Sequence, residues 1–339
     1  MQHDTRSLDE VMLARAIARM TPLLDRRARR DSAAAYAEIV RDELRDMSGG
    51  AAAAARAADT DGGELGRHGC HPIGRLLTPT QTSEVCAHLA ERPCFPGHVA
   101  RVGEVEPTSL DELRSEVHHG AYAPADVLAA PHLLELANRP DVLAIAADYL
   151  GCTPSLYSIN CFWSFSGHAQ PAAVAQRFHR DPDDLRFCTL FAFLTDVDAK
   201  TSPHSYVIGS HDYRAFDPLL LERARDAGMS EQQAHELLRL TYEGDGNRVN
   251  LDPYVDHLLA DRVVQVTGPA GTCFIEDTYG LHKGTNPSGG DRLVFWARYG
   301  LGPNLGYWLD RRAPLRIDVG DRLPRSAMTR YINRLVVQW

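Results

Sequence analysis

The sequence lacks the features of a membrane protein and of a disulfide-stabilised secreted domain. No run of apolar residues approaches the roughly 18 needed to span a membrane. The first residues, MQHDTRSLDE, are polar, and no apolar signal-peptide segment follows them. The seven cysteines are scattered, odd in number and never spaced as C-x-x-C, which argues against a disulfide framework or a zinc–thiolate site. We therefore expect a cytoplasmic protein whose cysteines are mostly small buried apolar residues.

An excess of basic charge is also missing. Lysine and arginine number 36 against 45 aspartates and glutamates, a formal net charge of −9. A surface of this sign repels phosphate backbones and anionic lipids, so we expect neither nucleic acid nor membranes as partners. The expected partner is a small-molecule substrate, and a carrier protein or a second copy of the chain stays open. With 44% hydrophobic and 24% charged residues, the composition is that of a globular protein with a sizeable core.

The first part of the chain, residues 8–47, reads as helices. The residues of one apolar stripe recur at the i, i+3, i+4 spacing of a helix: Leu8, Val11, Met12 and Ala16 and then Tyr36, Ile39, Val40, Leu44 and Met47. Residues 51–63 are low in complexity and read as a short helix or a linker. We divide the chain into a helical segment with linker, 1–62, and a main domain, 63–339. The helices either form a partner-binding arm or pack on the main domain, and we favour packing.

The main domain changes character along its length. Helical patterns predominate from about residue 76 to 151, and Asn138-Arg139-Pro140 is typical of a helix start. Short runs rich in aromatic and β-branched residues follow, with turn residues between them: 155–164, 187–196, 205–208, 263–266, 271–275 and 293–299. Many short strands between turns indicate an antiparallel sandwich or barrel. We predict a mainly β core with flanking helices, an α+β fold.

A helical insertion interrupts the predicted strands at about residues 217–260. Asp217-Pro218 predicts the start of one helix, and Ser230 with Gln233 predicts a capping box at the start of a second. An insertion of this kind commonly forms a lid over the mouth of a barrel. We expect this insertion and residues 95–125 to set substrate specificity.

The first candidate site lies in the segment Phe178-His179-Arg180-Asp181-Pro182. In an extended chain His179 and Asp181 point to the same side and can bind one metal ion. An imidazole and a carboxylate are two thirds of the 2-His-1-carboxylate triad that binds non-haem iron. Alone this pattern is weak, because about one H-x-D is expected by chance in a chain with 15 histidines.

Two residues about a hundred positions later strengthen the metal hypothesis. His282 stands between two predicted strands, and Arg292 follows ten residues later at the start of the second. An arginine there would place a permanently charged, planar fork beside the metal, suited to a carboxylate. Four such residues in this order are much harder to obtain by chance.

Two blocks of the sequence resemble the phytanoyl-CoA dioxygenase family of Fe(II)- and 2-oxoglutarate-dependent oxygenases. They are FHRDPDDLRFCTLFAFLTDVDAKTSPHSYVIGSH, residues 178–211, and IEDTYGLHKGTNPSGGDRLVFWARYG, residues 275–300. The resemblance implies a double-stranded β-helix, a jelly-roll, cupin-like barrel, over the main domain. It implies that His179, Asp181 and His282 bind Fe(II) and that Arg292 binds the C5 carboxylate of 2-oxoglutarate. With O2 as oxidant, the implied outcome is hydroxylation of a substrate C–H with release of succinate and CO2.

Three further residues are assigned to 2-oxoglutarate by the same resemblance. Thr189 stands where relatives often carry a lysine, and Thr285 is the nearest hydroxyl to Arg292. Asn160 is either a donor to the C1 carboxylate or a structural amide of the barrel. Because Asp181 is present, halogenation is disfavoured.

Other polar and aromatic residues read more simply as structural. His211 is expected to be a turn histidine, His204 a structural residue, and His118-His119 a solvated helix face. Trp296 and Arg298 share strand parity with Arg292, and Arg298 is expected to pair with an acid. The remaining expectations are a core role for Trp163 and an Arg180 side chain that points away from the metal and is free to close over the site.

Other functions stay open at this level. The barrel could be non-catalytic, or a cupin-type metal-dependent isomerase or hydrolase without 2-oxoglutarate, although Arg292 argues against the latter. An oxygenase could also desaturate, cyclise or epimerise, because substrate positioning decides the outcome. The substrate, a secondary-metabolite or carrier-bound intermediate, is not specified by any pattern.

Overall fold

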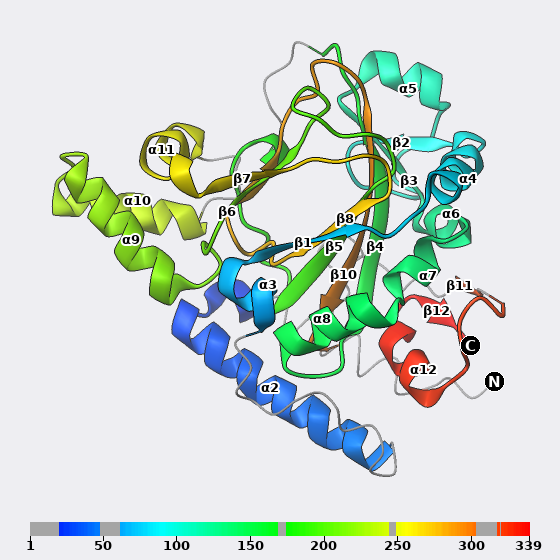
Figure 1. The fold of residues 1–339 in the computed structure, drawn as a ribbon, viewed down its shortest axis with the longest axis horizontal. Helices are drawn as coiled ribbons and strands as arrows, with labels where there is room; N and C mark the ends of the chain where they lie inside the picture. The colour runs from blue at the N-terminus through cyan, green and yellow to red at the C-terminus, as the bar shows by residue number, and fades with distance from the viewer. Residues whose placement is uncertain (1–19, 48–61, 169–173, 244–248, 303–316, 319) are drawn as a thin grey trace.

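The computed structural model describes residues 20–47, 62–168, 174–243, 249–302, 317–318 and 320–339 (Figure 1). The first predicted helical stripe, from Leu8 to Ala16, and most of the predicted linker lie outside these residues. The structure describes two antiparallel sheets with helices around them, which confirms the predicted mainly β core with flanking helices.

The larger sheet has seven strands in the order β1-β8-β5-β10-β4-β3-β2. Every pairing within it is antiparallel. Its strands are β1 (Cys70–Arg75), β2 (Cys94–Pro96), β3 (His119–Tyr122), β4 (Ser155–Ser164), β5 (Phe187–Phe193), β8 (Thr272–Glu276) and β10 (Arg292–Gly300). The smaller sheet has the antiparallel order β7-β6-β9, with β6 (His204–Val207), β7 (Val263–Val266) and β9 (His282–Gly284). A separate parallel pair joins β11 (Ile317–Asp318) and β12 (Val337–Gln338).

The central strand β10 is buried along its whole length. Side chains alternate across a strand, so Leu293 and Phe295 join the core under the helices, whereas Val294 and Trp296 face the smaller sheet. An apolar cluster formed by both sheets fills the space between them: Cys70, Phe191, Phe193, Tyr206, Val266, Phe274, Val294 and Trp296 belong to it. Because both faces of the large sheet are covered, β10 is apolar at both parities except where Arg292 and Arg298 enter the interior.

Helices cover the outer face of the large sheet and share one core cluster with it. They are α2 (Arg26–Met47), α4 (Pro79–Ala90), α6 (Pro124–Ala129), α7 (Leu133–Ala137), α8 (Pro140–Leu150) and α12 (Ala327–Asn333). Shorter elements complete the described chain: η1 (Thr21–Leu23), α3 (Gly63–His68), α5 (Leu110–Glu116), η2 (Val174–Gln176) and η3 (Ala260–Arg262). Pro140 occupies the first turn of α8 as predicted, but its N-cap is Arg139, whose side chain makes no capping bond.

Helix α2 packs on the body of the protein. Its buried stripe consists of Ala33, Ala37, Val40 and Leu44. The prediction that Val40 and Leu44 face the core is confirmed. The same prediction is wrong for Ile39, whose exposed fraction is 53%. The small side chains of Ala33 and Ala37 let the helix lie close to its neighbours. A search for large apolar residues at helical spacing does not predict this.

The helical insertion lies between β6 and β7 and contains α9 (Tyr213–Asp226), α10 (Glu231–Glu243) and α11 (Asp252–Leu258). Pro218 lies inside α9, so the predicted start at Asp217-Pro218 is wrong. The predicted capping box is confirmed, since Ser230 N–H donates to Gln233 Oε1 at 2.8 Å and Gln233 N–H donates to Ser230 Oγ at 3.3 Å.

The insertion packs against the smaller sheet and not over the cavity described below, where a lid was expected. Its apolar residues form a cluster with Phe178, Val207 and Leu281. None of the insertion's described residues lines the cavity described below, so the structure gives these helices no lid position. Burial of an amphipathic face against the smaller sheet positions these helices, and sequence spacing does not reveal which sheet receives that face.

The six predicted strands are found within a few residues of their predicted bounds, but the other six described strands were missed: β1, β2, β3, β9, β11 and β12. Strands β2 and β3 lie in the region expected to be helical. Strand β1 contains Pro72 and Gly74, residues typical of turns, and its register shifts between them. A proline is tolerated there because β1 is an edge strand of the sheet.

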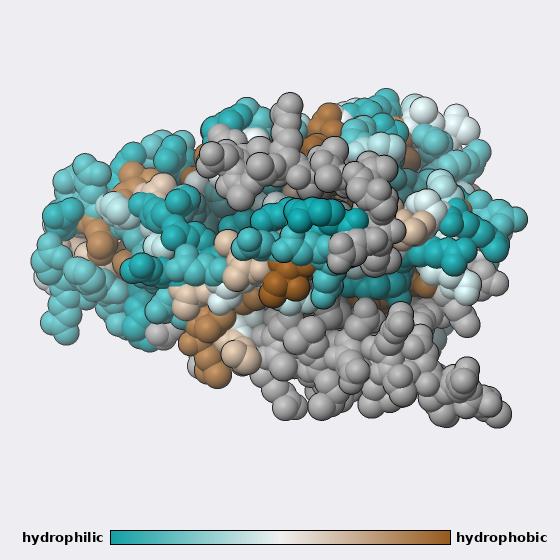
Figure 2. Space-filling view, turned by 90° about the horizontal axis from the view of Figure 1, so that it is seen from below, coloured by the Kyte–Doolittle hydropathy of each residue, from teal (hydrophilic) through white to brown (hydrophobic). Residues whose placement is uncertain are grey.

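The cysteines and the surface agree with the expectations from composition. All seven cysteines are free, and six are buried. Seen from below, the coloured part of the surface is mostly hydrophilic (Figure 2). Within the described residues, no helix combines the length and apolarity that a membrane crossing requires.

Arg180 connects the insertion to the sheet. As expected, its side chain points away from its neighbours His179 and Asp181. Its guanidinium donates to Thr241 O at 2.7 Å, Ser210 O at 2.7 Å and Tyr279 O at 2.5 Å. It is buried in these contacts and does not close over the site.

Replacing Arg180 with alanine should lower the free energy of unfolding by about 2–4 kcal/mol, because three buried carbonyl oxygens lose their donors. Urea unfolding of purified protein measures this. Arg225→Ala is the matched control, since Arg225 is exposed on α9 and its loss should change stability by less than about 0.5 kcal/mol. Equal effects of the two substitutions would contradict this role of Arg180.

Candidate metal centre

The chain brings His179, Asp181 and His282 together by backbone pairing. Residues 178–181 run alongside β9 as a further extended segment. His179 N–H donates to His282 O at 3.0 Å, and His282 N–H donates to His179 O at 3.1 Å. Asp181 N–H donates to Thr278 O at 2.8 Å. The pairing places the two histidines opposite each other, and the two-residue strand period turns Asp181 to the same side.

The three side chains can hold a metal ion. One ligand atom from each lies within 4.8 Å of the other two. Asp181 Oδ1 is 3.8 Å from His179 Nε2, and Asp181 Oδ2 is 3.8 Å from His282 Nε2. This is the donor set of the 2-His-1-carboxylate triad, which occupies one face of an ion and leaves the opposite positions to other ligands.

Both imidazoles are held in the tautomer that a metal needs. His179 Nδ1 lies 2.8 Å from Arg177 O, and His282 Nδ1 lies 3.0 Å from Gly280 O. A carbonyl oxygen can only accept, so each Nδ1 carries the proton and each Nε2 keeps its lone pair towards the centre. Burial lowers the pKa of His282 to about 4, which keeps this ligand neutral at physiological pH.

Arg298 holds the carboxylate ligand. One of its Nη atoms donates to Asp181 Oδ2 at 2.6 Å and the other to Asp183. Burial would raise the pKa of Asp181, but the charge of Arg298 and the two histidines lower it below its usual value. The carboxylate is therefore anionic. The prediction that Arg298 pairs with an acid is confirmed, although the acid is the metal ligand itself.

Arg292 is a buried cation beside the triad. Its Nη1 donates to Ser202 O at 2.5 Å and its Nη2 to Ser164 Oγ at 3.2 Å, while its Nε is buried without a hydrogen-bond partner. Among the described residues, no carboxylate forms an ion pair with Arg292. Burial lowers the pKa of its guanidinium to about 10, so the group is still charged at neutral pH. An uncompensated buried charge of this kind favours an anionic ligand.

The main chain that orients Arg292 is unusual. Ser202 has a φ of +65°, in the left-handed region that few residues other than glycine adopt. Its hydroxyl donates to Thr285 O, and its own carbonyl accepts from Arg292. Such a conformation persists where surrounding contacts over-determine it, and it often accompanies a functional site.

A cavity of about 90 Å³ contains both the triad and Arg292. Its apolar wall comes from the inner face of the large sheet: Phe162, Phe191, Phe193, Phe274, Val294 and Trp296. Residues 95–125, predicted to influence specificity, contribute His98, Val99 and His119.

The three predicted 2-oxoglutarate contacts have different positions. Thr285 lines the cavity. Thr189 is fully buried between Arg298 and Glu276 in the sheet register and is not among the lining residues. Asn160 also lies off the cavity, and its Nδ2 donates to His98 O at 2.7 Å. The observed contact of Asn160 is therefore that of a structural amide, the second of the two roles expected for it. This hydrogen bond holds the loop that carries His98.

Two histidines lie in positions that differ from the expectation, and a third was not considered. His119 begins strand β3, is buried and lines the cavity, so the prediction of a solvated helix face is wrong for it. His204 also lines the cavity, stacked on the ring of His282 with 5.6 Å between centroids. His98 was not singled out, because nothing in its local sequence signals a site. In contrast, His211 bonds to Gly66 O at 3.0 Å, away from the triad, and Trp163 bonds to Tyr122 in the outer core.

Glu276 is a buried acid that the sequence did not single out. Its Oε1 lies 2.8 Å from His204 Nε2. Burial raises the pKa of Glu276 to about 8, and burial together with the charge of Arg292 lowers the pKa of His204 to about 3. At neutral pH both groups are mostly uncharged, and the carboxyl hydroxyl donates to the imidazole.

Comparisons with known proteins give structural similarity alone. No protein-family model and no characterised sequence matches the chain. Among solved structures, it is similar to the non-heme alpha ketoglutarate dependent epimerase SnoN from nogalamycin biosynthesis, with a TM-score of 0.45, 17% identity and coverage of 70% of this chain and 81% of that one. HygX from Streptomyces hygroscopicus with nickel and 2-oxoglutarate bound gives a TM-score of 0.42, 17% identity and coverages of 70% and 84%. EctD from S. alaskensis with 2-oxoglutarate and 5-hydroxyectoine gives a TM-score of 0.45 and 13% identity, with coverage of 77% of this chain and 86% of that one. Because these TM-scores lie below 0.5, we infer the function from the site's own residues.

The triad predicts one divalent metal ion per chain. In anaerobic titration calorimetry with Fe(II), His282→Ala should bind at least about a hundredfold more weakly than wild type, because loss of a ligand costs more than loss of its supporting hydrogen bonds. His235→Ala, at an exposed position on α10, is the control and should leave the affinity unchanged. Undiminished binding by His282→Ala would rule out this centre.

Glu276 predicts a pH dependence of stability. Since its folded-state pKa is raised to about 8, the folded protein keeps a proton that the unfolded chain has lost, and the free energy of unfolding falls as pH rises towards 8. Between pH 6.5 and 8 the metal-free wild type should lose stability relative to Glu276→Gln by up to about 1.4 kcal/mol per pH unit. Urea unfolding at several pH values tests this, and parallel curves would show that Glu276 does not titrate there.

Proposed function

We propose that this protein is an Fe(II)- and 2-oxoglutarate-dependent oxygenase acting on a small molecule. The observation that carries the proposal is the pairing, in one cavity, of a His179–Asp181–His282 triad with Arg292, a buried cation without a carboxylate partner among the described residues. The proposal includes the finer fold prediction, in which the two sheets form a closed double-stranded β-helix.

The residues present fit the metal and its cosubstrate. Two neutral imidazoles and a carboxylate suit Fe(II), and bound iron with 2-oxoglutarate would supply oxygen activation, with release of succinate and CO2. Arg292 would bind the distal carboxylate of 2-oxoglutarate in a bidentate manner, with Thr285 beside it. Ser202 and Ser164 hold the guanidinium in place through the contacts described above. Thr189 and Asn160 are not retained as cosubstrate contacts.

Other residues would prepare the site for the reaction. Arg298 keeps Asp181 anionic and restrains its rotation, so the ligand stays aimed at the metal. The aromatic wall excludes water from the reacting centre, which protects reactive species from side reactions. Both features are built from β10 and its neighbours, the most buried part of the sheet.

Hydroxylation of an unactivated C–H is the reaction we propose. The cavity offers the substrate an apolar wall together with the imidazoles of His98 and His119. Burial lowers the pKa of His119 to about 3, so it is neutral and can form a hydrogen bond with an uncharged polar group. We infer a largely apolar substrate with at least one polar function near this end of the cavity.

A cupin-type enzyme without 2-oxoglutarate is the second candidate that the triad allows. Such an enzyme has no need of an unpaired buried arginine, whose burial is costly unless an anion compensates it. Arg292 therefore favours the oxygenase.

Succinate formation from 2-oxoglutarate, with Fe(II), ascorbate and O2 but without added substrate, tests the proposal. Wild type should form succinate slowly, and His179→Ala should form none. Arg292→Gln should need at least about tenfold more 2-oxoglutarate for the same rate, because a charge-assisted bidentate contact is lost. It should still bind one metal ion, which separates anion binding from metal binding.

Arg225→Gln serves as the control for removal of one positive charge and should behave as wild type. The proposal fails if wild type forms no succinate and 2-oxoglutarate causes no change in the absorption of the Fe(II)-loaded protein under anaerobic conditions.

A further inference from the structure

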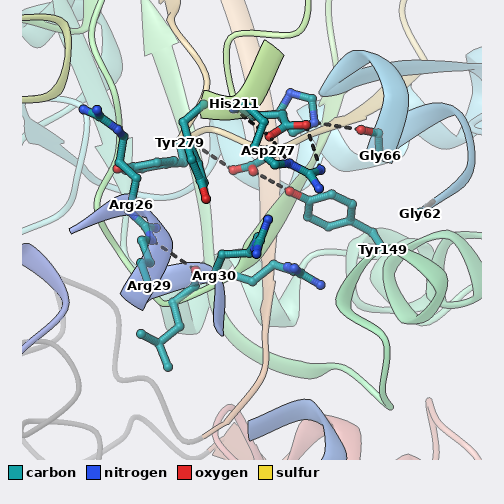
Figure 3. Close-up of a pocket in the computed structure, with 14 residues that line it drawn as sticks. Arg26, Arg29, Arg30, Gly62, Gly66, Tyr149, His211, Asp277 and Tyr279 are labelled. Carbon is teal, nitrogen blue, oxygen red and sulfur yellow. Dashed lines mark hydrogen bonds and ion pairs between the residues drawn. The ribbon is translucent and has the colours of Figure 1, made fainter. Parts of the chain in front are cut away.

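A second cavity, of about 220 Å³, lies at the junction of α2, α3, the start of α9 and the turn 277–279 (Figure 3). In the described part of the chain it shares no lining residue with the cavity around the triad. Figure 3 shows the α2 side chains Arg26, Arg29 and Arg30 facing Tyr149, His211 and Asp277 across this space. The segments that meet here are far apart in the sequence.

Positive charge predominates in this cavity. The arginines that line it come from three segments: Arg26, Arg29, Arg30, Arg186 and Arg214. Against five arginines, the lining contains two carboxylates, Asp212 and Asp277. On a protein with a formal net charge of −9, a concentration of arginines is a local feature and does not reflect a generally basic surface.

The lining carboxylates are already engaged. Asp212 accepts from Nε and Nη2 of Arg214 at 2.9 and 2.8 Å. Asp277 accepts from the hydroxyl of Tyr149 and, at 2.8 Å, from the N–H of Tyr279. Arg26 is paired with Asp217 at 2.8 Å. Arg214 thus compensates Asp212, whereas the partners of Asp277 are neutral and leave it as one negative charge against the remaining arginines.

Arg29 is buried and held by neutral partners. Its guanidinium donates to the carbonyl oxygens of Asp184 and Leu185 and lies 3.5 Å from the ring centroid of Tyr279. These contacts fix its position without cancelling its charge. Burial raises the pKa of the Asp184 carboxyl to about 7, although the charge of Arg29 acts to lower it, so this acid compensates Arg29 incompletely.

Two further arginines are available for a ligand. Arg186 lies 6.0 Å from the ring centroid of Tyr149 and, among the described residues, forms no ion pair. Arg30 pairs at 3.1 Å with its neighbour Asp31, an exposed residue outside the cavity lining. Such a surface pair contributes little and can rearrange.

We propose that this cavity binds the phosphate group of a small organic ligand. Several guanidinium groups converge from α2 and from the approach to β5, and a phosphate carries enough charge and acceptor oxygens to engage them together. A single carboxylate would leave most of this charge uncompensated. The ligand is distinct from 2-oxoglutarate, whose proposed site is the cavity of Arg292.

Calorimetric titration of the full chain with pyrophosphate and with orthophosphate tests this proposal. The protein is freed of divalent ions by a chelator and kept at physiological ionic strength, which suppresses non-specific attraction. Wild type should show saturable binding at one site. The double variant Arg30→Gln/Arg186→Gln should bind at least about tenfold more weakly. Tighter binding of pyrophosphate indicates linked phosphates, and equal binding indicates a single phosphate group.

Two controls distinguish binding in this cavity from general charge attraction and from binding beside Arg292. Arg101→Gln/Arg225→Gln removes the same charge from exposed positions, and Arg292→Gln alters the other cavity; both should bind as wild type. If the first double variant does not fold, Arg186→Gln alone should bind at least about threefold more weakly. The proposal is overturned if wild type binds neither probe, if both double variants lose affinity equally, or if only Arg292→Gln does.

Discussion

The ion pair between Arg298 and Asp181 is the interaction on which the candidate metal centre depends. It joins the central strand of the large sheet to the segment that pairs with the smaller sheet, so it crosses the interior between the two layers. A carboxylate in such an interior would otherwise tend to take up a proton, and a protonated Asp181 would be a poor ligand. The fold thus places the cation of Arg298 beside the Asp181 carboxylate, whose ability to bind a metal would otherwise be weakened by burial.

Strand β10 organises both halves of the site. Its inward parity carries Arg292 at one end and Arg298 near the other, with Val294 and Trp296 between them. One strand thereby contributes the proposed anion-binding group, the support of the candidate metal ligand and part of the apolar wall. Burial on both faces makes this strand rigid, which suits groups whose positions must be accurate.

Local sequence pattern was enough to predict which side chains share one side of a strand. His179 and Asp181 share a side because of the strand period, and Arg292, Trp296 and Arg298 do so for the same reason. Residues brought together by long-range register were not predictable: His98, the His204–Glu276 pair and the arginines of the second cavity have no local signal. Pro218 in α9 misled because tertiary packing outweighs propensity. The insertion was predicted correctly as helical, but its expected position as a lid was wrong, because its apolar face packs on the smaller sheet.

The candidate metal ligands are contributed by segments about a hundred residues apart that meet through the pairing of residues 178–181 with β9. An unfolded chain therefore contains no preformed site, and whatever affinity the folded protein has for its ion adds directly to the free energy of unfolding. Metal supply and protein lifetime become linked quantities: a chain synthesised without its ion would be correct in sequence yet more easily unfolded and proteolysed than a loaded one.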